Sequence, residues 1–186
     1  MSTLRVDNIT NEDGSASPNL PNGLSGDVLT SGTVDTARMP AGSVIQVVQG
    51  TSTIKNLSTT STSFVNTGLN LSITPISTTS KIYFILSTTL NAQTVGNFVD
   101  LSIFRSIDGG SETNLADSSP RDSFPGAAHF SVNADIHYPA TINHLDSPNT
   151  ALTINYIVKF KSRDGGSVRF NPEGFLTTFI LMEIAG

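Results

Sequence analysis

Several segments of this chain alternate between apolar and polar residues with a period of two, and this pattern limits the chain to a β-rich fold. In residues 69–73, Leu69, Leu71 and Ile73 alternate with polar neighbours, and residues 82–86 repeat the pattern. Residues 129–138 alternate over their whole length. Alternation of this kind places apolar side chains on one face of a strand and polar ones on the other. It is typical of antiparallel sheets with one face in solvent.

Further segments extend the same pattern through the chain. Apolar or alternating runs occur at 44–49, 99–103, 152–160 and 179–184, and no convincing helical stripe interrupts them. Phe179–Ile184 is apolar on both faces, which favours a central or interface strand. About eight or nine strands without a helix predict an all-β fold, an antiparallel β-sandwich of jelly-roll type, over residues 43–186.

Residues 1–42 differ from the rest of the chain. Their apolar residues are isolated, and stretches such as Pro21-Asn-Gly and Ser25-Gly-Asp separate them. Such polarity permits a disordered tail. The alternative is an extended arm that becomes ordered on assembly, because isolated Leu and Val side chains can each fill a partner's groove. We favour the arm, so the expected organisation is an attachment arm, 1–42, and a sandwich domain, 43–186.

Charge and cysteine content exclude several classes of protein. The formal net charge is −5 and the pI is about 4.9, whereas a nucleic-acid-binding protein needs a basic face. There is no cysteine, so neither a disulfide nor a thiolate metal site is possible. No segment is apolar enough for insertion into a membrane, and the first residues do not resemble a signal peptide.

Motifs for catalysis are also missing, and we expect a protein that is not an enzyme and needs no cofactor. The sequence has no Gly-x-Ser-x-Gly motif, no glycine-rich phosphate loop after a strand, and no carboxylate pair in an evident apolar context. His129, His137 and His144 raise the question of a metal site. His129 and His137 would lie about 26 Å apart along one strand, so we expect surface histidines and no metal.

A short sequence occurs twice. Phe104-Arg-Ser-Ile-Asp-Gly-Gly-Ser resembles Phe160-Lys-Ser-Arg-Asp-Gly-Gly-Ser. Asp-Gly-Gly supplies the positive-φ positions of a tight hairpin, whereas a calcium loop would need more carboxylates. We therefore expect two similar hairpin turns.

Two long segments, 107–127 and 139–150, are the candidate binding loops. Long loops on a rigid sandwich are a usual place for recognition. Their polar and aromatic side chains suit a sugar, because polar groups reach hydroxyls while a ring stacks on C–H bonds. The alternative is that both segments are solvated loop tips. The candidate contacts with a host-surface glycan are Arg121, Asp122, Phe124, His144 and Asp146.

Several stretches resemble tail-fibre and related virion proteins of tailed phages, especially those of cyanobacterial and marine hosts. They are Leu4-Arg-Val-Asp-Asn-Ile with the following Glu12-Asp-Gly, the segment 32–49, Asn70–Ile82 and Ile180–Ala185. The resemblance implies a homotrimeric fibre subunit that is made in the host cytoplasm and becomes part of the virion. Its arm would attach to the tail or baseplate, and its β-domain would face the host.

Two other functions remain open. The chain could be a capsid decoration or other particle-stabilising protein, which would have an apolar docking face and no pocket. A small polysaccharide depolymerase is the less favoured alternative and would have carboxylates clustered in a groove.

Overall fold

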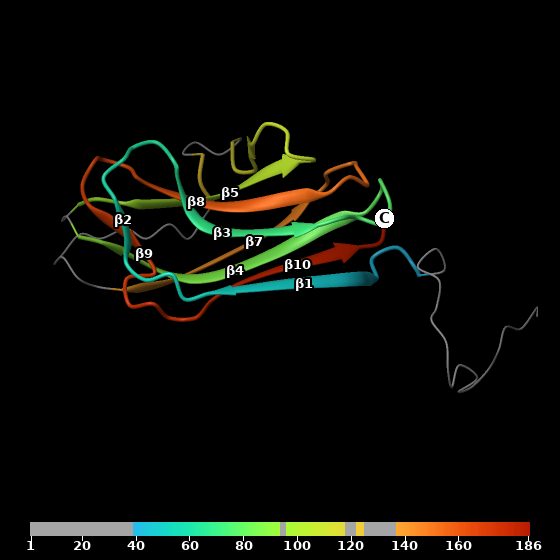
Figure 1. Cartoon of the computed structure of the whole chain (residues 1–186), viewed down its shortest axis with the longest axis horizontal. Helices are drawn as coiled ribbons and strands as arrows, with labels where there is room; N and C mark the ends of the chain where they lie inside the picture. The colour runs from blue at the N-terminus through green and yellow to red at the C-terminus, as the bar shows by residue number, and fades with distance from the viewer. Residues whose placement is uncertain (1–38, 94–95, 118–121, 125–136) are drawn as a thin grey trace, which may run out of the picture. The chain divides into compact units, whose positions relative to one another are not determined.

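A computed structural model describes residues 39–93, 96–117, 122–124 and 137–186. These residues form ten strands and no helix, so none of the described segments is a helix that could span a membrane. The strands make two antiparallel sheets packed face to face (Figure 1). The predicted all-β sandwich is therefore confirmed.

The first sheet contains six strands. Its order is β1 (Val44–Ser52), β10 (Thr177–Ile184), β4 (Lys81–Ala92), β9 (Val168–Phe170) and β2 (Leu57–Thr59), and β7 (Tyr138–Asp146) pairs with the other edge of β4. The second sheet has the order β3 (Val65–Ile73), β8 (Ile154–Ser162), β5 (Val99–Ile107) and β6 (Thr113–Asn114).

The strand order is that of a jelly roll. Without the three-residue strands β2 and β9, the two sheets read β1-β10-β4-β7 and β3-β8-β5-β6. Consecutive long strands therefore alternate between the sheets at β3–β4 and β4–β5, as two interlocked Greek keys require. The jelly-roll character expected from the sequence is present.

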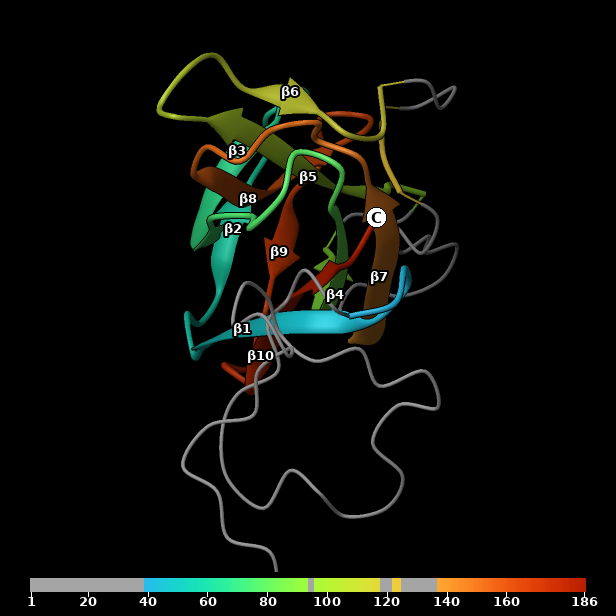
Figure 2. The ribbon, with the colours of Figure 1, turned by 90° about the vertical axis from the view of Figure 1, so that its right-hand side faces the viewer.

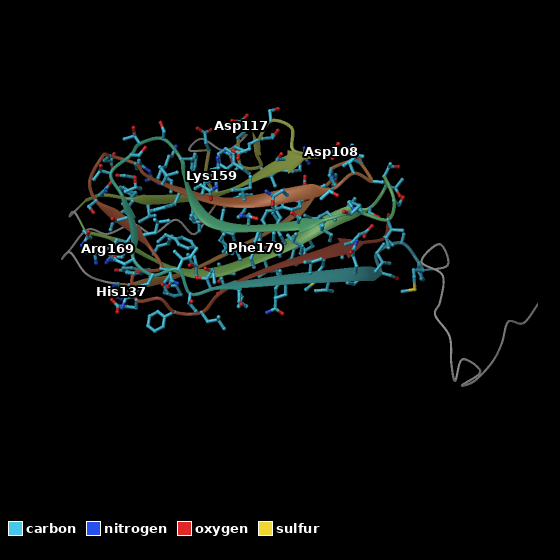
Figure 3. All side chains as sticks on the ribbon, viewed as in Figure 1. Asp108, Asp117, His137, Lys159, Arg169 and Phe179 are labelled. Atoms are coloured by element: carbon cyan, nitrogen blue, oxygen red, sulfur yellow. The ribbon has the colours of Figure 1, made fainter. Side chains whose placement is uncertain are left out.

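The core lies between the two sheets and comes from the inward positions of the alternating strands. Phe84, Leu86, Tyr156, Phe160 and Phe179 are fully buried there, and Figure 3 shows Phe179 between the layers. The residues whose alternation predicted strands in 69–73, 82–86 and 99–103 lie in β3, β4 and β5. The predicted strand 129–138 lies outside the described residues except for its last two residues, and β7 begins at Tyr138.

Strand β10 has the central position predicted for residues 179–184. It pairs with β1 on one side and β4 on the other. Phe179 and Leu181 point into the core, whereas Ile180, Met182 and Ile184 are half-buried on the outward face. The two apolar faces of this strand therefore have different surroundings.

The two Asp-Gly-Gly sequences form turns of different kinds. Asp108 and Gly109 have φ angles of 49° and 71° between the paired strands β5 and β6, which makes the predicted hairpin. Gly165 has a φ of 82°, but β8 and β9 do not pair with each other, because β9 belongs to the opposite sheet. The second turn is therefore a connection between sheets, and the prediction of a hairpin there was wrong.

The sandwich has two distinct ends. Residues 39–43 and the C-terminus lie at one end, where the Gly42 amide donates to the Ala185 carbonyl over 2.7 Å and the Ala185 amide donates to Ser43 over 2.9 Å. The connections 74–80, 108–112 and 147–153 lie at this end too, because β4 and β8 begin there and β5 and β7 end there. We call it the entry end. Figure 3 shows Asp108 near it, and His137 and Arg169 toward the opposite, far end.

Candidate functional site

The candidate site predicted from the sequence falls on one side of the sandwich, between β7 at the edge of the first sheet and β5–β6 in the second (Figure 2). Arg121 lies outside the described residues. Asp122, Phe124, His144 and Asp146 are described, and only part of this set is exposed.

Asp146 is a structural residue at the end of a strand, and the prediction that residues 139–150 form a loop was wrong for residues 139–146. Tyr138–Asp146 is β7, and Asp146 points inward on the same face as Ala140 and Ile142. Its carboxylate accepts two hydrogen bonds from Arg105 Nη1, of 2.7 and 3.0 Å, and one from Tyr156 Oη, of 2.8 Å. Its side chain is 8% exposed. A ligand could reach this carboxylate only by displacing those partners.

The environment of Asp146 also keeps the Tyr156 hydroxyl protonated. Burial raises the pKa of the Tyr156 hydroxyl well above its usual range, and the negative charge of Asp146 raises that pKa further. The hydroxyl therefore remains a hydrogen-bond donor at every physiological pH. Asp146 comes from the first sheet, while Arg105 and Tyr156 are opposite each other on β5 and β8 of the second. The cluster is a polar link between the two sheets.

Phe124 and His144 are brought together, as a shared binding surface would require, but Phe124 is largely buried. The Phe124 ring lies 5.5 Å from the His144 ring and 5.8 Å from the Phe84 ring, measured between centroids. The Phe124 amide donates to the Leu101 carbonyl over 3.1 Å, which extends the second sheet along β5. Phe124 therefore closes the side of the core, and His144 covers it from the solvent side.

Asp122 and His144 remain as accessible members of the predicted set. Asp122 is exposed and has a φ of 53°, and its carbonyl accepts a hydrogen bond of 2.8 Å from Asn114 Nδ2. Its carboxylate is thus held on a fixed backbone and faces solvent. His144 is exposed on β7 apart from its ring contacts with Phe84 and Phe124. These two side chains could offer hydrogen bonds to a ligand.

A small hollow near this side has Arg105 in its wall. Its volume is about 270 Å³, and it is lined by Arg105, Ile107, Gly110, Ser111 and Thr113 at the β5–β6 hairpin. Ser106 Oγ donates to the Gly110 carbonyl over 2.7 Å and holds the turn. Arg105 is partly exposed there, but Asp146 balances its charge. The hollow offers a small polar ligand hydrogen-bonding groups and little net charge.

No group of three or more potential metal ligands is found among the described residues. His137 lies next to Glu173, with 3.7 Å between His137 Nε2 and Glu173 Oε1, and His144 lies seven residues farther along. His129 lies outside the described residues. Asp100, the other buried aspartate of the described core, is paired with Arg163, whose Nε donates over 3.2 Å.

The far end carries a loop, held by hydrogen bonds from Asn171, that was not predicted from the sequence. Asn171 is fully buried with a φ of 45°, and its Nδ2 donates to the carbonyls of Ile54 and Phe175 over 2.9 and 2.7 Å. The loop it holds presents Phe175 and Leu176, which are 57% and 64% exposed. The Asn171-Pro-Glu-Gly sequence signals a turn, but it does not reveal that the next two residues are exposed.

Comparison with known proteins yields structural likenesses alone. No family model and no curated protein matches the chain. The VP2 subviral particle of infectious bursal disease virus is similar with a TM-score of 0.49 and 12% identity, over 84% of this chain and 37% of that one. The T13 particle of the same virus gives a TM-score of 0.47 and 10% identity, over 77% and 37%. The chain thus spans little more than a third of these VP2 chains, and at such TM-scores neither likeness is evidence of its function.

Proposed function

We propose that this protein is a structural virion protein, the subunit of a homotrimeric tail fibre or related appendage of a tailed phage. Residues 1–42 attach it to the tail or baseplate, and the sandwich is presented to the host surface. The observation that carries this proposal is the separation of the two ends. The chain enters the sandwich beside its own C-terminus, at Gly42 and Ala185, which leaves the far end directed away from the point of attachment.

Two further features support a structural role. Jelly rolls recur in viral capsid and lectin domains, although a fold by itself does not define a function. The buried carboxylates of Asp100 and Asp146 are each bound to an arginine, and that of Glu183 accepts hydrogen bonds from Gln46 Nε2 and the Ile76 amide. None of these three carboxylates stands free in a groove, as the acid and base of a polysaccharide depolymerase would. The described residues therefore favour a binding or structural protein over that enzyme.

Adhesion to host cells can be assigned to one of two surfaces by matched variants. One is the side of the sandwich with Asp122 and His144, and the other is the far-end loop with Phe175 and Leu176. Alanine replacement of Phe124 or Asp146 would confuse loss of folding with loss of binding, since both are buried. We therefore compare the Asp122→Ala/His144→Ala double variant with Phe175→Ala in binding of labelled protein to host cells. Since the far end lies opposite Gly42, where the chain enters the sandwich, we expect the larger loss for Phe175→Ala.

A capsid decoration is the second candidate function, and one observation favours it. The outward face of the first sheet carries exposed apolar side chains, among them Val47 and Leu145, as a docking surface on a capsid would. Gold-labelled antibodies against residues 43–186, applied to particles of the phage that encodes the chain, separate the two candidates. Label on the tail supports the fibre, and label on the head supports decoration. Absence of label, with antibodies that bind the native recombinant protein, would overturn a virion role.

A further inference from the structure

The outward face of the first sheet is apolar where a solvated sheet would be polar. Val47, Met182, Tyr83 and Leu145 are register partners in one row across β1, β10, β4 and β7, so their side chains share this face. Ile180 and Ile184 lie beside that row on β10. Val47 is 57% exposed and Leu145 45% exposed. We call this surface the apolar face.

Charge is nearly absent from the apolar face. Among the described residues that β1, β10, β4 and β7 turn outward, Lys81 at the start of β4 is the one charged residue. Toward the far end, the next row is Gln49, Ile180, Ile85 and Asn143, with an uncharged amide at each end. The row after it contains the hydroxyl residues Thr51, Thr178, Ser87 and Thr141. A partner placed on this face would therefore bury very few charges.

The other sheet of the same sandwich provides an internal comparison. Its outward positions include Asn66, Asn70 and Ser72 on β3, Lys159 and Lys161 on β8, and a single apolar pair of register partners, Ile157 and Phe104, with Lys159 over the Phe104 ring. Lys159 forms an ion pair with Glu112. Both sheets belong to one jelly roll, so the fold itself does not require an apolar outer surface. The difference indicates that the first sheet is covered.

We propose that the apolar face is the surface through which three copies of this chain pack around a common axis. This inference rests on the homotrimer of the proposed function and names the surface that forms it. A second copy fits because a face with almost no charge meets no like-charge repulsion when it approaches its equivalent on another subunit.

The dimensions of the apolar face suit a threefold arrangement. Four strands at about 4.8 Å spacing make the sheet about 19 Å wide, and eight residues make it about 27 Å long, or about 500 Å² in projection. The face is thus as large as the largest apolar patch on a typical monomer, which is about 300–600 Å². Its projected area is somewhat smaller than the roughly 800 Å² of accessible surface that each partner buries in a stable complex. Three faces about 19 Å wide close a triangle whose sides lie about 5.5 Å from its centre. Packed sheets lie about 10 Å apart, so each is about 5 Å from the midplane, and side chains can fill this space.

The position of the entry end agrees with such an axis. The strands run along the axis, and the chain enters each sandwich at one end of β1, beside Ala185. In a trimer closed through the apolar face, the three copies of Met39 emerge at the same end. The three far ends then point together in the opposite direction, as a fibre tip requires.

The first test introduces one charge into each face. Val47→Asp and Leu145→Asp alter exposed positions of the apolar face, and Asn70→Asp is the matched control on the other sheet. Sedimentation equilibrium at micromolar concentration measures the mass of each full-length chain, and circular dichroism checks its fold. We expect wild type and Asn70→Asp to be trimers, and each apolar-face variant to dissociate at least tenfold more readily.

The second test requires no disruptive substitution. Because the chain has no cysteine, Val47→Cys and Asn70→Cys each introduce a single thiol. Alkylation by a maleimide, followed by mass spectrometry, should be at least tenfold slower for Val47→Cys, since that thiol is covered in the trimer.

The outcomes separate this inference from the proposed function. Trimeric Asp variants, or a Val47→Cys thiol as reactive as that of Asn70→Cys, in a chain whose wild type is trimeric, would overturn the assignment of this face and leave the trimer standing. A monomeric wild type would overturn both the trimer and the interface. It would leave the face to a different virion protein.

Discussion

Tyr156 Oη donates a hydrogen bond of 2.8 Å to Asp146 Oδ2, and this bond joins the two sheets of the sandwich on their open side. The same carboxylate binds the partly exposed Arg105, so a buried carboxylate neutralises an arginine and accepts from a hydroxyl beneath the side surface. Buried charges are tolerated when paired and hydrogen-bonded. The relationship explains why an aspartate stands at an inward position of β7.

Replacement of Asp146 by alanine should therefore destabilise the fold. The change leaves Arg105 without its counter-ion and Tyr156 without its acceptor. Since Arg105 is partly exposed, we expect the free energy of unfolding to fall by about 3 kcal/mol, at the lower end of the range for broken buried pairs. Urea unfolding at fixed protein concentration measures this change. Asp122→Asn, at an exposed position whose positive φ asparagine also tolerates, is the control and should change the value by less than about 0.5 kcal/mol. Equal effects of the two variants would contradict a structural role for Asp146.

Because the pKa of the Tyr156 hydroxyl is raised, we expect the protein to lose stability at alkaline pH. Its pKa in the folded protein is raised by burial and by Asp146, whereas in the unfolded chain it is about 10. The stabilisation from this group is therefore complete below pH 10 and decreases as the pH rises further, by up to about 1.4 kcal/mol per pH unit.

Tyr156→Phe removes the titrating group and isolates this effect. At pH 7 the variant should be less stable than wild type by about 1–2 kcal/mol, because it lacks the hydrogen bond to Asp146. Between about pH 10 and 11 the difference should shrink toward zero, because the wild type alone loses this contribution. Unfolding by urea at a series of pH values measures both curves. A difference that stays constant to pH 11 would show that Tyr156 titrates normally in the folded state.

The strands were predictable because their side chains report burial directly. Leu69, Phe84 and Leu101 occupy the inward positions that the alternation of apolar and polar residues assigned to them. The short strands β2, β6 and β9 were not foreseen, because two or three residues give no periodic signal. The order of strands in the sheets also depends on pairing between residues far apart in the chain, which periodicity does not specify.

The candidate site was harder to predict for a physical reason. Asp146 and Phe124 have the chemical character of ligand contacts, but their role depends on partners that come from other strands. Arg105 lies 41 residues from Asp146, and Phe84 lies 40 residues from Phe124. Sequence reasoning located the side surface but could not separate its buried supports from its exposed groups, Asp122 and His144.

The far-end loop should depend on Asn171 more than on any residue at its tip. Asn171→Ala removes the donors to the Ile54 and Phe175 carbonyls and places a residue with a Cβ but no compensating contacts at a positive φ. We expect a loss of about 3 kcal/mol, from unpaired buried groups and backbone strain together. Asn171→Gly loses the same donors without the strain and should be less destabilised by up to about 1 kcal/mol. Hydrogen exchange of the backbone amides in residues 171–176 should accelerate in both variants. Unchanged exchange would show that Asn171 does not hold this loop in place.

Removal of residues 1–38 tests whether the chain has two parts with separate roles. The truncated chain keeps Gly42 and Ser43, whose backbone groups pair with Ala185 and close the entry end of the sandwich. It also keeps every residue of the apolar face. We therefore expect it to be folded and trimeric, with a melting temperature within about 3 °C of the full-length value. Removal of residues 1–43 takes away both pairings with Ala185 and should lower the melting temperature further.

The second measurement is incorporation into phage particles. When the two chains are expressed to the same level, the full-length chain should be present in the virion and the truncated chain should be missing from it. An insoluble truncated chain would show that the arm is part of the folded domain. A truncated chain that enters particles at the normal level would show that attachment does not depend on residues 1–38.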